Sequence, residues 1–396
     1  MPRLLFRSKL RWGVILIVAM VALGLLGTMF SRHLRVADVA QLLLTPWLAP
    51  AYLGDGKPAA ELLLCFPMGL ALNQAGEVLI SDRGRDRRGR VVWRIDSHGI
   101  AHILAGTGRR GNATATTARA LSFSRPEGLA VGADGSVFVS DAFNHAVYRI
   151  HTDGRVTRVA GTGFPGYAGD GGPASEAMLN RPADIRLDRK GNLFIADVRN
   201  HSVRKVDASG RITTVAGTGE PGFSTDGTPA AKAKLNSPWG LAVDHEDLLI
   251  IADSENHRVR RVQGDGRLVT LAGNGREGFN GDGGLATEAS LSAPQALSFD
   301  PSGRLFIGDE HNNAVRVLGT DGRISTVMGT GAPGRAVIGD RAQGSALNDP
   351  ENVLITPADE LIITDGENGR VLRISADGRI HNLAGRGETR RCALGW

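Results

Sequence analysis

The stretch Gly191-Asn-Leu-Phe-Ile-Ala-Asp197 is one of six closely similar stretches in this chain of 396 residues. The aspartates that end them are spaced by 59, 56, 56, 56 and 56 residues and are Asp82, Asp141, Asp197, Asp253, Asp309 and Asp365. Around each aspartate lie four short runs rich in Val, Ile, Leu and Phe, bounded by Gly, Asp or Asn, and such runs indicate strands. The repeat therefore predicts an all-β fold, a six-bladed β-propeller with four-stranded antiparallel blades over residues 54–396.

The two ends of the repeat array predict a closed ring. Gly54-Asp-Gly-Lys-Pro-Ala59 matches Gly169-Asp-Gly-Gly-Pro-Ala174, and Ala384-Gly-Arg-Gly387 matches Ala160-Gly-Thr-Gly163. The C-terminal stretch and residues 54–67 thus form one complete connection between blades that is cut once. We expect the first and last blades to be neighbours without strand exchange, because each repeat carries four strands of its own.

The N-terminal residues predict a membrane anchor. Positions 12–30 carry no charge, which is long enough for a helix to cross a bilayer core of ~30 Å. Four basic residues precede this stretch and two follow it, so residues 1–11 are expected in the cytoplasm and the propeller in the periplasm or outside. The sequence therefore predicts a transmembrane signal-anchor helix over residues 12–31 and a tether over 32–53. A cleaved signal peptide is the alternative.

The charge of the chain does not favour a nucleic-acid partner. The net charge is +5, but six of the 46 basic residues and no acidic residue lie in the first 35 positions. The remainder carries 40 basic and 41 acidic residues, so it has no bulk basic field. One local exception is the basic segment from Arg83 to Arg90, which is either a solvated loop or a docking site for anionic lipid or an acidic partner.

The chain has two cysteines, and both fall in the connection that its two ends share. In repeat coordinates Cys65 aligns with Asn180 and Cys392 with Ala168. In an oxidising compartment a bond between them would lock the ring, and closing so long a loop is worth roughly 4–5 kcal/mol in the chain-entropy model. The alternative is two unpaired thiols, because this alignment does not fix the Cα separation that a disulfide needs.

The second copy of the repeat resembles the NHL repeat. It reads Pro126-Glu-Gly-Leu-Ala-Val131, Gly135-Ser-Val-Phe-Val-Ser-Asp141 and Asn144-His145-Ala-Val-Tyr-Arg-Ile150. The long connections are similar to those of bacterial extracytoplasmic proteins and teneurin-type propellers. This resemblance implies the propeller fold but says little of function, because one fold hosts many activities.

Recurrent polar residues are expected to be structural. The repeated Asp and His lie at the turn between the second and third strands of each blade, where they can accept backbone N–H bonds or cap the turn. The Gly-Asp-Gly segments lack the ligand pattern of a calcium loop, so their glycines are expected to adopt positive φ in tight turns.

Breaks in the repeat are better candidates for function. The innermost strand begins with Pro-x and then Gly in three copies, but Asp184, Ala296 and Asn352 in the others. These residues should surround one mouth of the central channel, where propellers commonly bind ligands. The ligand-binding candidates at this mouth are Glu127, Asp184, Trp239, Gln295, Glu351 and Asn352. Trp239 could stack on a sugar ring or a peptide side chain, and the carboxylates could hold a cation or a basic group. A solvated channel lined by unrelated hydrophilic residues is the alternative.

These observations favour a membrane-anchored, non-catalytic binding or scaffold module without a cofactor. Its expected partner is a protein, peptide or saccharide of the cell envelope, and not nucleic acid. The alternative is a metal-dependent hydrolase or lyase similar to gluconolactonases, with a divalent cation such as Ca or Zn held by Glu127, Asp184 and Glu351. No Ser-His-Asp or Cys-His arrangement is recognisable.

Overall fold

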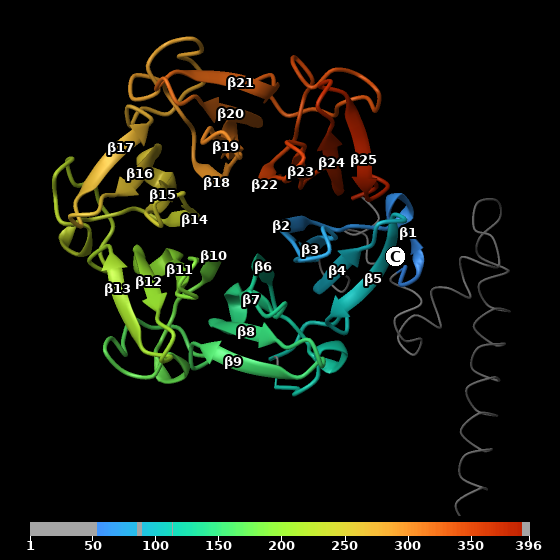
Figure 1. The fold of residues 1–396 in the computed structure, drawn as a ribbon, viewed down its shortest axis with the longest axis vertical. Helices are drawn as coiled ribbons and strands as arrows, with labels where there is room; N and C mark the ends of the chain where they lie inside the picture. The colour runs from blue at the N-terminus through green and yellow to red at the C-terminus, as the bar shows by residue number, and fades with distance from the viewer. Residues whose placement is uncertain (1–53, 85–88, 113, 390–396) are drawn as a thin grey trace, which may run out of the picture. The chain divides into compact units, whose positions relative to one another are not determined.

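A computed structural model describes residues 54–84, 89–112 and 114–389 of the chain. These residues form a six-bladed β-propeller, as predicted, with the blades arranged around a centre in chain order (Figure 1). Each blade is an antiparallel sheet whose four main strands are consecutive in the chain. The expectation that no strand is exchanged between blades is therefore confirmed.

The strands repeat with nearly constant length and register. Blade 1 consists of β2 (Pro67–Leu72), β3 (Val78–Asp82), β4 (Val91–Ile95) and β5 (Ile100–Ala105), with the short β1 (Lys57–Pro58) added at the edge of β5. Blades 2 and 3 are β6 (Pro126–Val131), β7 (Val137–Asp141), β8 (Ala146–Ile150) and β9 (Val156–Ala160), then β10 (Pro182–Leu187), β11 (Leu193–Asp197), β12 (Ser202–Val206) and β13 (Ile212–Ala216). Blade 4 is β14 (Pro238–Val243), β15 (Leu249–Asp253), β16 (Arg258–Val262) and β17 (Leu268–Ala272). Blades 5 and 6 are β18 (Pro294–Phe299), β19 (Leu305–Asp309), β20 (Ala314–Leu318) and β21 (Ile324–Gly329), then β22 (Pro350–Ile355), β23 (Leu361–Asp365), β24 (Arg370–Ile374) and β25 (Ile380–Ala384).

Short 3₁₀ helices mark the turns and the connections. In blades 2 to 5 the second strand runs directly into η4 (Ala142–Asn144), η6 (Val198–Asn200), η8 (Ser254–Asn256) or η9 (Glu310–Asn312). The connections between blades carry η2 (Ala59–Glu61), η3 (Ala118–Ala120), η5 (Ala174–Glu176) and η7 (Ala230–Lys232). The first strand of every blade faces the centre, and the fourth lies at the rim (Figure 1).

The ring closes between blades 6 and 1 through the same bonds that join other neighbours. Gly385 N–H donates to Ala59 O at 2.9 Å, just as Gly161 N–H donates to Ala174 O at 3.0 Å. The Thr364 hydroxyl of blade 6 donates to Met68 O of blade 1 at 3.2 Å. The predicted split connection is therefore correct, and the first and last blades are neighbours.

The hydrophobic core is divided among the interfaces between blades. Six buried clusters each combine residues of two adjacent blades, and one of them joins blade 1 to blade 6. Both faces of each blade are thus covered by its neighbours, which is why alternating and continuous apolar strands both occur. No single blade can bury its apolar faces alone, so the ring is expected to unfold cooperatively.

Three predictions concern residues outside the described ranges. Among the described residues no helix is long and apolar enough to cross a membrane, and the predicted anchor at residues 12–31 lies outside them. Cys65 is buried at 1% exposure and is not a free thiol, whereas Cys392 lies outside the described residues, so their pairing stays a prediction. Positions 85–88 of the basic segment also lie outside them.

Candidate functional site

The repeated aspartate holds the backbone where each innermost strand begins. Asp197 accepts a hydrogen bond from Asn180 N–H at 2.6 Å and another from the Asn200 amide at 2.8 Å. Arg204, which is 1% exposed on its side chain, lies 3.4 Å from the same carboxylate and also bonds Asp170. The structural role predicted for the aspartate is confirmed. The buried arginine was missed, although it recurs at the 56-residue period as Arg260 and Arg316.

The Asn-His pairs of blades 2, 3 and 4 join each of these blades to the next. His145 adopts a left-handed conformation with φ of 49°, and its Nδ1 accepts the N–H of Arg181 on blade 3 at 3.2 Å. His201 and His257 do the same for Ser237 and Ala293. Burial lowers the pKa of His145, which favours the neutral ring that this acceptor role needs. These histidines fix backbone geometry, as the sequence analysis predicted.

Three positions per blade form a ring around the centre, which we call the inner ring. The first is the residue before the strand proline, and its members are Phe66, Arg125, Arg181, Ser237, Ala293 and Asp349. The second follows that proline, with Met68, Glu127, Ala183, Trp239, Gln295 and Glu351. The third follows the repeated aspartate, with Arg83, Ala142, Val198, Ser254, Glu310 and Gly366. Unlike the Asp, Asn and His of the turns, these residues differ from blade to blade.

The charges of the inner ring are segregated. Blades 1, 2 and 3 contribute the arginines Arg83, Arg125 and Arg181, together with Glu127, which is paired with Arg125; blades 5 and 6 contribute the other three carboxylates and no arginine. Each arginine lies over an aromatic ring. The guanidinium carbon is 3.3 Å from the Phe66 centroid for Arg83, 5.1 Å from Phe143 for Arg125, and 4.6 Å from Trp239 for Arg181. Such stacking restricts the guanidinium while leaving its edge free to donate hydrogen bonds.

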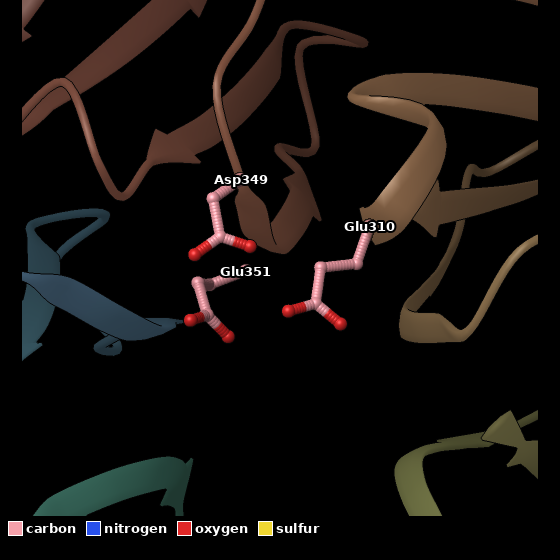
Figure 2. Close-up of side chains that lie close together, drawn as sticks. All are labelled: Glu310, Asp349 and Glu351. Carbon is pink, nitrogen blue, oxygen red and sulfur yellow. The ribbon is translucent and has the colours of Figure 1, made fainter. Parts of the chain in front are cut away.

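The three carboxylates of blades 5 and 6 converge. Ligand oxygens of Glu310, Asp349 and Glu351 lie within 4.8 Å of one another, and Figure 2 shows their side chains turned toward one space inside the ring. Burial and the neighbouring carboxylates Glu351 and Asp349 raise the pKa of Glu310 to about 10. Burial and Asp349 raise the pKa of Glu351 to about 8, although Arg83 opposes this at 3.6 Å. The group therefore has a high affinity for a proton or another cation.

The site residues predicted from the sequence make different contacts in the structure. Glu127 is buried at 2% exposure and ion-paired with Arg125, and Gln295 donates to Glu310. Asp184 instead accepts the N–H groups of Ile185 and Leu241, both at 2.9 Å, and binds Arg186 at 2.6 Å.

Asn352 lies on β22 and donates its backbone N–H to Thr364 at 2.7 Å. Trp239 lies beneath Arg181. Among the described residues the structure does not group Glu127 and Asp184 with Glu351 as a set of ligands; Glu351 groups with Glu310 and Asp349.

Sequence reasoning missed Arg83, Arg125, Arg181, Glu310 and Asp349. Each lies beside a position that was considered, either before the proline or after the aspartate, and each breaks the repeat. The same criterion applied to those flanking positions would have found them. The predicted basic segment is also partly corrected, because Arg83 faces the inner ring and Arg90 is buried and donates to Ser124 O at 3.1 Å.

Comparison with known proteins agrees with the fold. The NHL repeat family matches residues 235–262, and the teneurin NHL domain family matches residues 165–225. The chain therefore carries repeats of the NHL type. Teneurin-m of Drosophila melanogaster is 29% identical over 69% of the chain and 10% of its own length, and NHL repeat-containing protein 2 of Bos taurus is 27% identical over 83% of the chain and 47% of its own length.

The chain spans at most about half the length of these relatives. A solved gluconolactonase of Xanthomonas campestris has a TM-score of 0.53 at 16% identity, covering 82% of this chain and 88% of its own. That likeness concerns the fold alone.

The crowding of carboxylates predicts a stabilising substitution. Glu310 and Glu351 have folded pKa values above their ordinary 4.5, so the folded state retains protons that the unfolded chain has released at neutral pH. Stability contributed by these groups is present below about pH 4.5 and is lost as the pH rises toward 8–10. Glu310→Gln removes this penalty and is expected to stabilise the protein by roughly 1–3 kcal/mol at pH 8, and by less at pH 5.

Urea unfolding of both proteins at the two pH values measures this difference. The exposed Glu255→Gln is the control, and it should change stability little at either pH. A Glu310→Gln protein that is less stable than the wild type at pH 8 would show that the carboxylates are held by bonds that favour their charged forms.

Proposed function

We propose that the protein is a non-catalytic binding module that takes its ligand at the inner ring, on a propeller held outside the cytoplasmic membrane by residues 12–31. The observation that carries this proposal is the concentration of non-repeating charged side chains at the inner ring. Structural residues recur in most blades, whereas Trp239 and Glu310 each occur once and an arginine at the position of Arg181 occurs in two blades. The apolar stretch and the distribution of basic residues at the N-terminus support the anchor.

Candidate catalytic groups already form hydrogen bonds or ion pairs within the chain, which favours binding over catalysis. Asp184 is committed to two backbone N–H groups and Arg186. His145 uses Nδ1 to hold the backbone of the next blade, so it is not placed to act as a general base at the inner ring. The groups that remain, guanidinium, carboxylate and indole, suit recognition of a charged or amphipathic ligand.

The ligand classes that fit this surface are a protein, peptide or saccharide of the cell envelope. Opposite charges on different blades do not form the continuous basic track that nucleic acid needs. Attachment to the same membrane would raise the effective concentration of partners in that envelope.

A second candidate function is metal-dependent hydrolysis at Glu310, Asp349 and Glu351. The convergence of their oxygens favours it, and carboxylates are ligands that Ca²⁺ accepts. This set replaces the one expected from sequence, of which it keeps Glu351.

Retention of candidate ligands on the immobilised full-length chain tests the proposal. Peptides and cell-wall saccharides should be retained and recovered chemically unchanged, and Trp239→Ala should weaken retention at least about tenfold. Phe164→Ala is the matched control because Phe164 is 70% exposed on a connection between blades. Hydrolysed products together with stoichiometric metal, both lost in Glu310→Gln, would favour the second candidate. Retention that is unaffected by Trp239→Ala would contradict the proposed site.

A further inference from the structure

Arg181 and the carboxylates Asp349 and Glu351 lie on opposite sides of the inner ring. Arg181 begins blade 3, and Asp349 and Glu351 flank the proline that begins blade 6. In a ring of six blades these two blades are diametrically opposed, as Figure 1 shows for β10 and β22. Between them on one side lie Trp239 of blade 4 and Gln295 of blade 5.

Arg181 is the arginine of the inner ring whose charge is least compensated. Arg83 has Glu351 at 3.6 Å, and Arg125 is ion-paired with Glu127. In the described part of the chain Arg181 forms no ion pair, and its Nε is buried without a hydrogen-bond acceptor. A buried N–H without a partner is costly, so an acceptor from outside the chain would be favourable at this position.

The position of Arg181 is fixed before any ligand arrives. Its side chain lies on Trp239 at 4.6 Å, and its backbone has φ of 59° with the N–H held by His145 Nδ1. A non-glycine residue in this conformation persists only where surrounding contacts hold it. A preorganised guanidinium binds a carboxylate at a lower entropic cost than a mobile one.

On the opposite side carboxylates outnumber cationic groups, which are Arg83 at 3.6 Å from Glu351 and the exposed His311 at 3.9 Å from Glu310. Of the three carboxylates there, Glu351 has Arg83 nearby, but its Oε2 is buried without a hydrogen-bond donor. Its side chain is 3% exposed and points into the space shared with Glu310 and Asp349 (Figure 2). A basic group placed in this space would supply donors and relieve the mutual repulsion of the carboxylates.

The part of the inner ring between Arg181 and the carboxylates, formed by Trp239 and Gln295, can accommodate a peptide backbone. Gln295 Oε1 is buried without a hydrogen-bond donor, and the partly exposed Trp239 offers an apolar face beside it. An amide carbonyl is an acceptor for a peptide N–H, and an indole face packs against aliphatic side chains.

We infer that the ligand is a peptide that carries both a carboxylate and a basic side chain, with the carboxylate on Arg181, the basic group among Glu310, Asp349 and Glu351, and the backbone over Trp239 and Gln295. This inference rests on the proposed binding function and names its ligand class. A free amino acid without a basic side chain does not fit, because its α-ammonium and carboxylate are separated by two bonds whereas the recognising groups lie on opposed blades.

Calorimetric titration of the full-length chain with four matched peptides tests the inference. The probes are acetyl-Lys-Ala-Ala with a free C-terminus, its C-terminal amide, acetyl-norleucine-Ala-Ala, and the amide of the latter. The first should bind, and removal of either charge should weaken binding on the order of tenfold or more. Arg181→Gln should weaken the binding of the free acids and leave the affinity for the amides unchanged. Glu310→Gln should weaken the binding of the lysine peptides and leave the affinity for the norleucine peptides unchanged.

The controls are Arg155→Gln and Glu255→Gln, which change exposed residues outside the inner ring and should leave all four affinities unchanged. Equal affinities for the four peptides that are lost in Trp239→Ala would overturn the charge pairing and leave the proposed binding site intact. Binding unaffected by Arg181→Gln, Glu310→Gln and Trp239→Ala would overturn both. No binding of the lysine free acid at millimolar concentration would overturn the inference, while saccharide retention that depends on Trp239 would still support the proposed function.

Discussion

Replacing Asp197 by alanine is expected to destabilise the propeller by about 3–5 kcal/mol. Asp197 is fully buried and is the carboxylate that faces the buried Nη1 of Arg204 at 3.4 Å. It also accepts the N–H of Asn180, which would lose its acceptor. The substitution therefore leaves a buried guanidinium undercompensated and a backbone donor unpaired at the start of an innermost strand.

Urea unfolding measures this cost, and Asp170→Ala is the matched control. Asp170 binds the same Arg204 at 2.6 Å, but its side chain is 49% exposed, so water can replace it. The control should lose about 1 kcal/mol or less. Equal losses for the two variants would show that the buried aspartate has no special role in holding the blades.

A second large effect is expected at Gly240, where β14 of blade 4 passes close to β18 of blade 5. A Cβ at this position would lie 1.9 Å from Gln295 O, and this atom belongs to the backbone. The clash can be relieved only by moving one blade against the other, so Gly240→Ala should cost about 3 kcal/mol. It should also weaken ligand binding, because Gln295 is a member of the inner ring.

Gly264→Ala is the control for this steric effect. No heavy atom lies within 4 Å of a Cβ built there, and its φ is not in the left-handed region. This variant should be as stable as the wild type or slightly more so. Thermal unfolding that gives the same midpoint for Gly240→Ala and Gly264→Ala would contradict the close packing of the innermost strands.

The fold could be predicted from the sequence because the repeat constrains the number of blades, the closure of the ring and the turns within each blade. The period gave the number of blades, the matching ends gave closure, and the recurrence of Asp and His correctly indicated structural roles. Arg204 shows the limit of that reasoning. Its burial follows from a partner 34 residues earlier in the chain, Asp170, and no local pattern pairs the two.

The candidate site was predicted only in part, for a physical reason. Adjacent residues of a strand point to opposite sides, so a carboxylate beside a Pro-x-Gly motif can turn inward like Glu351 or toward a neighbouring backbone like Asp184. The convergence of Glu310 with Asp349 depends on how two blades meet, which the period does not specify. Positions flanking the motif therefore had to be located in three dimensions.

The most direct test of the account is an NMR titration that follows the indole N–H of Trp239 in the full-length chain labelled at tryptophan. The account predicts that acetyl-Lys-Ala-Ala shifts this resonance saturably, because the peptide lies on the ring that also supports Arg181. The indole of Trp93, which is 2% exposed between blades 1 and 6, should not move. An unmoved Trp239 resonance at millimolar peptide would contradict binding at the inner ring.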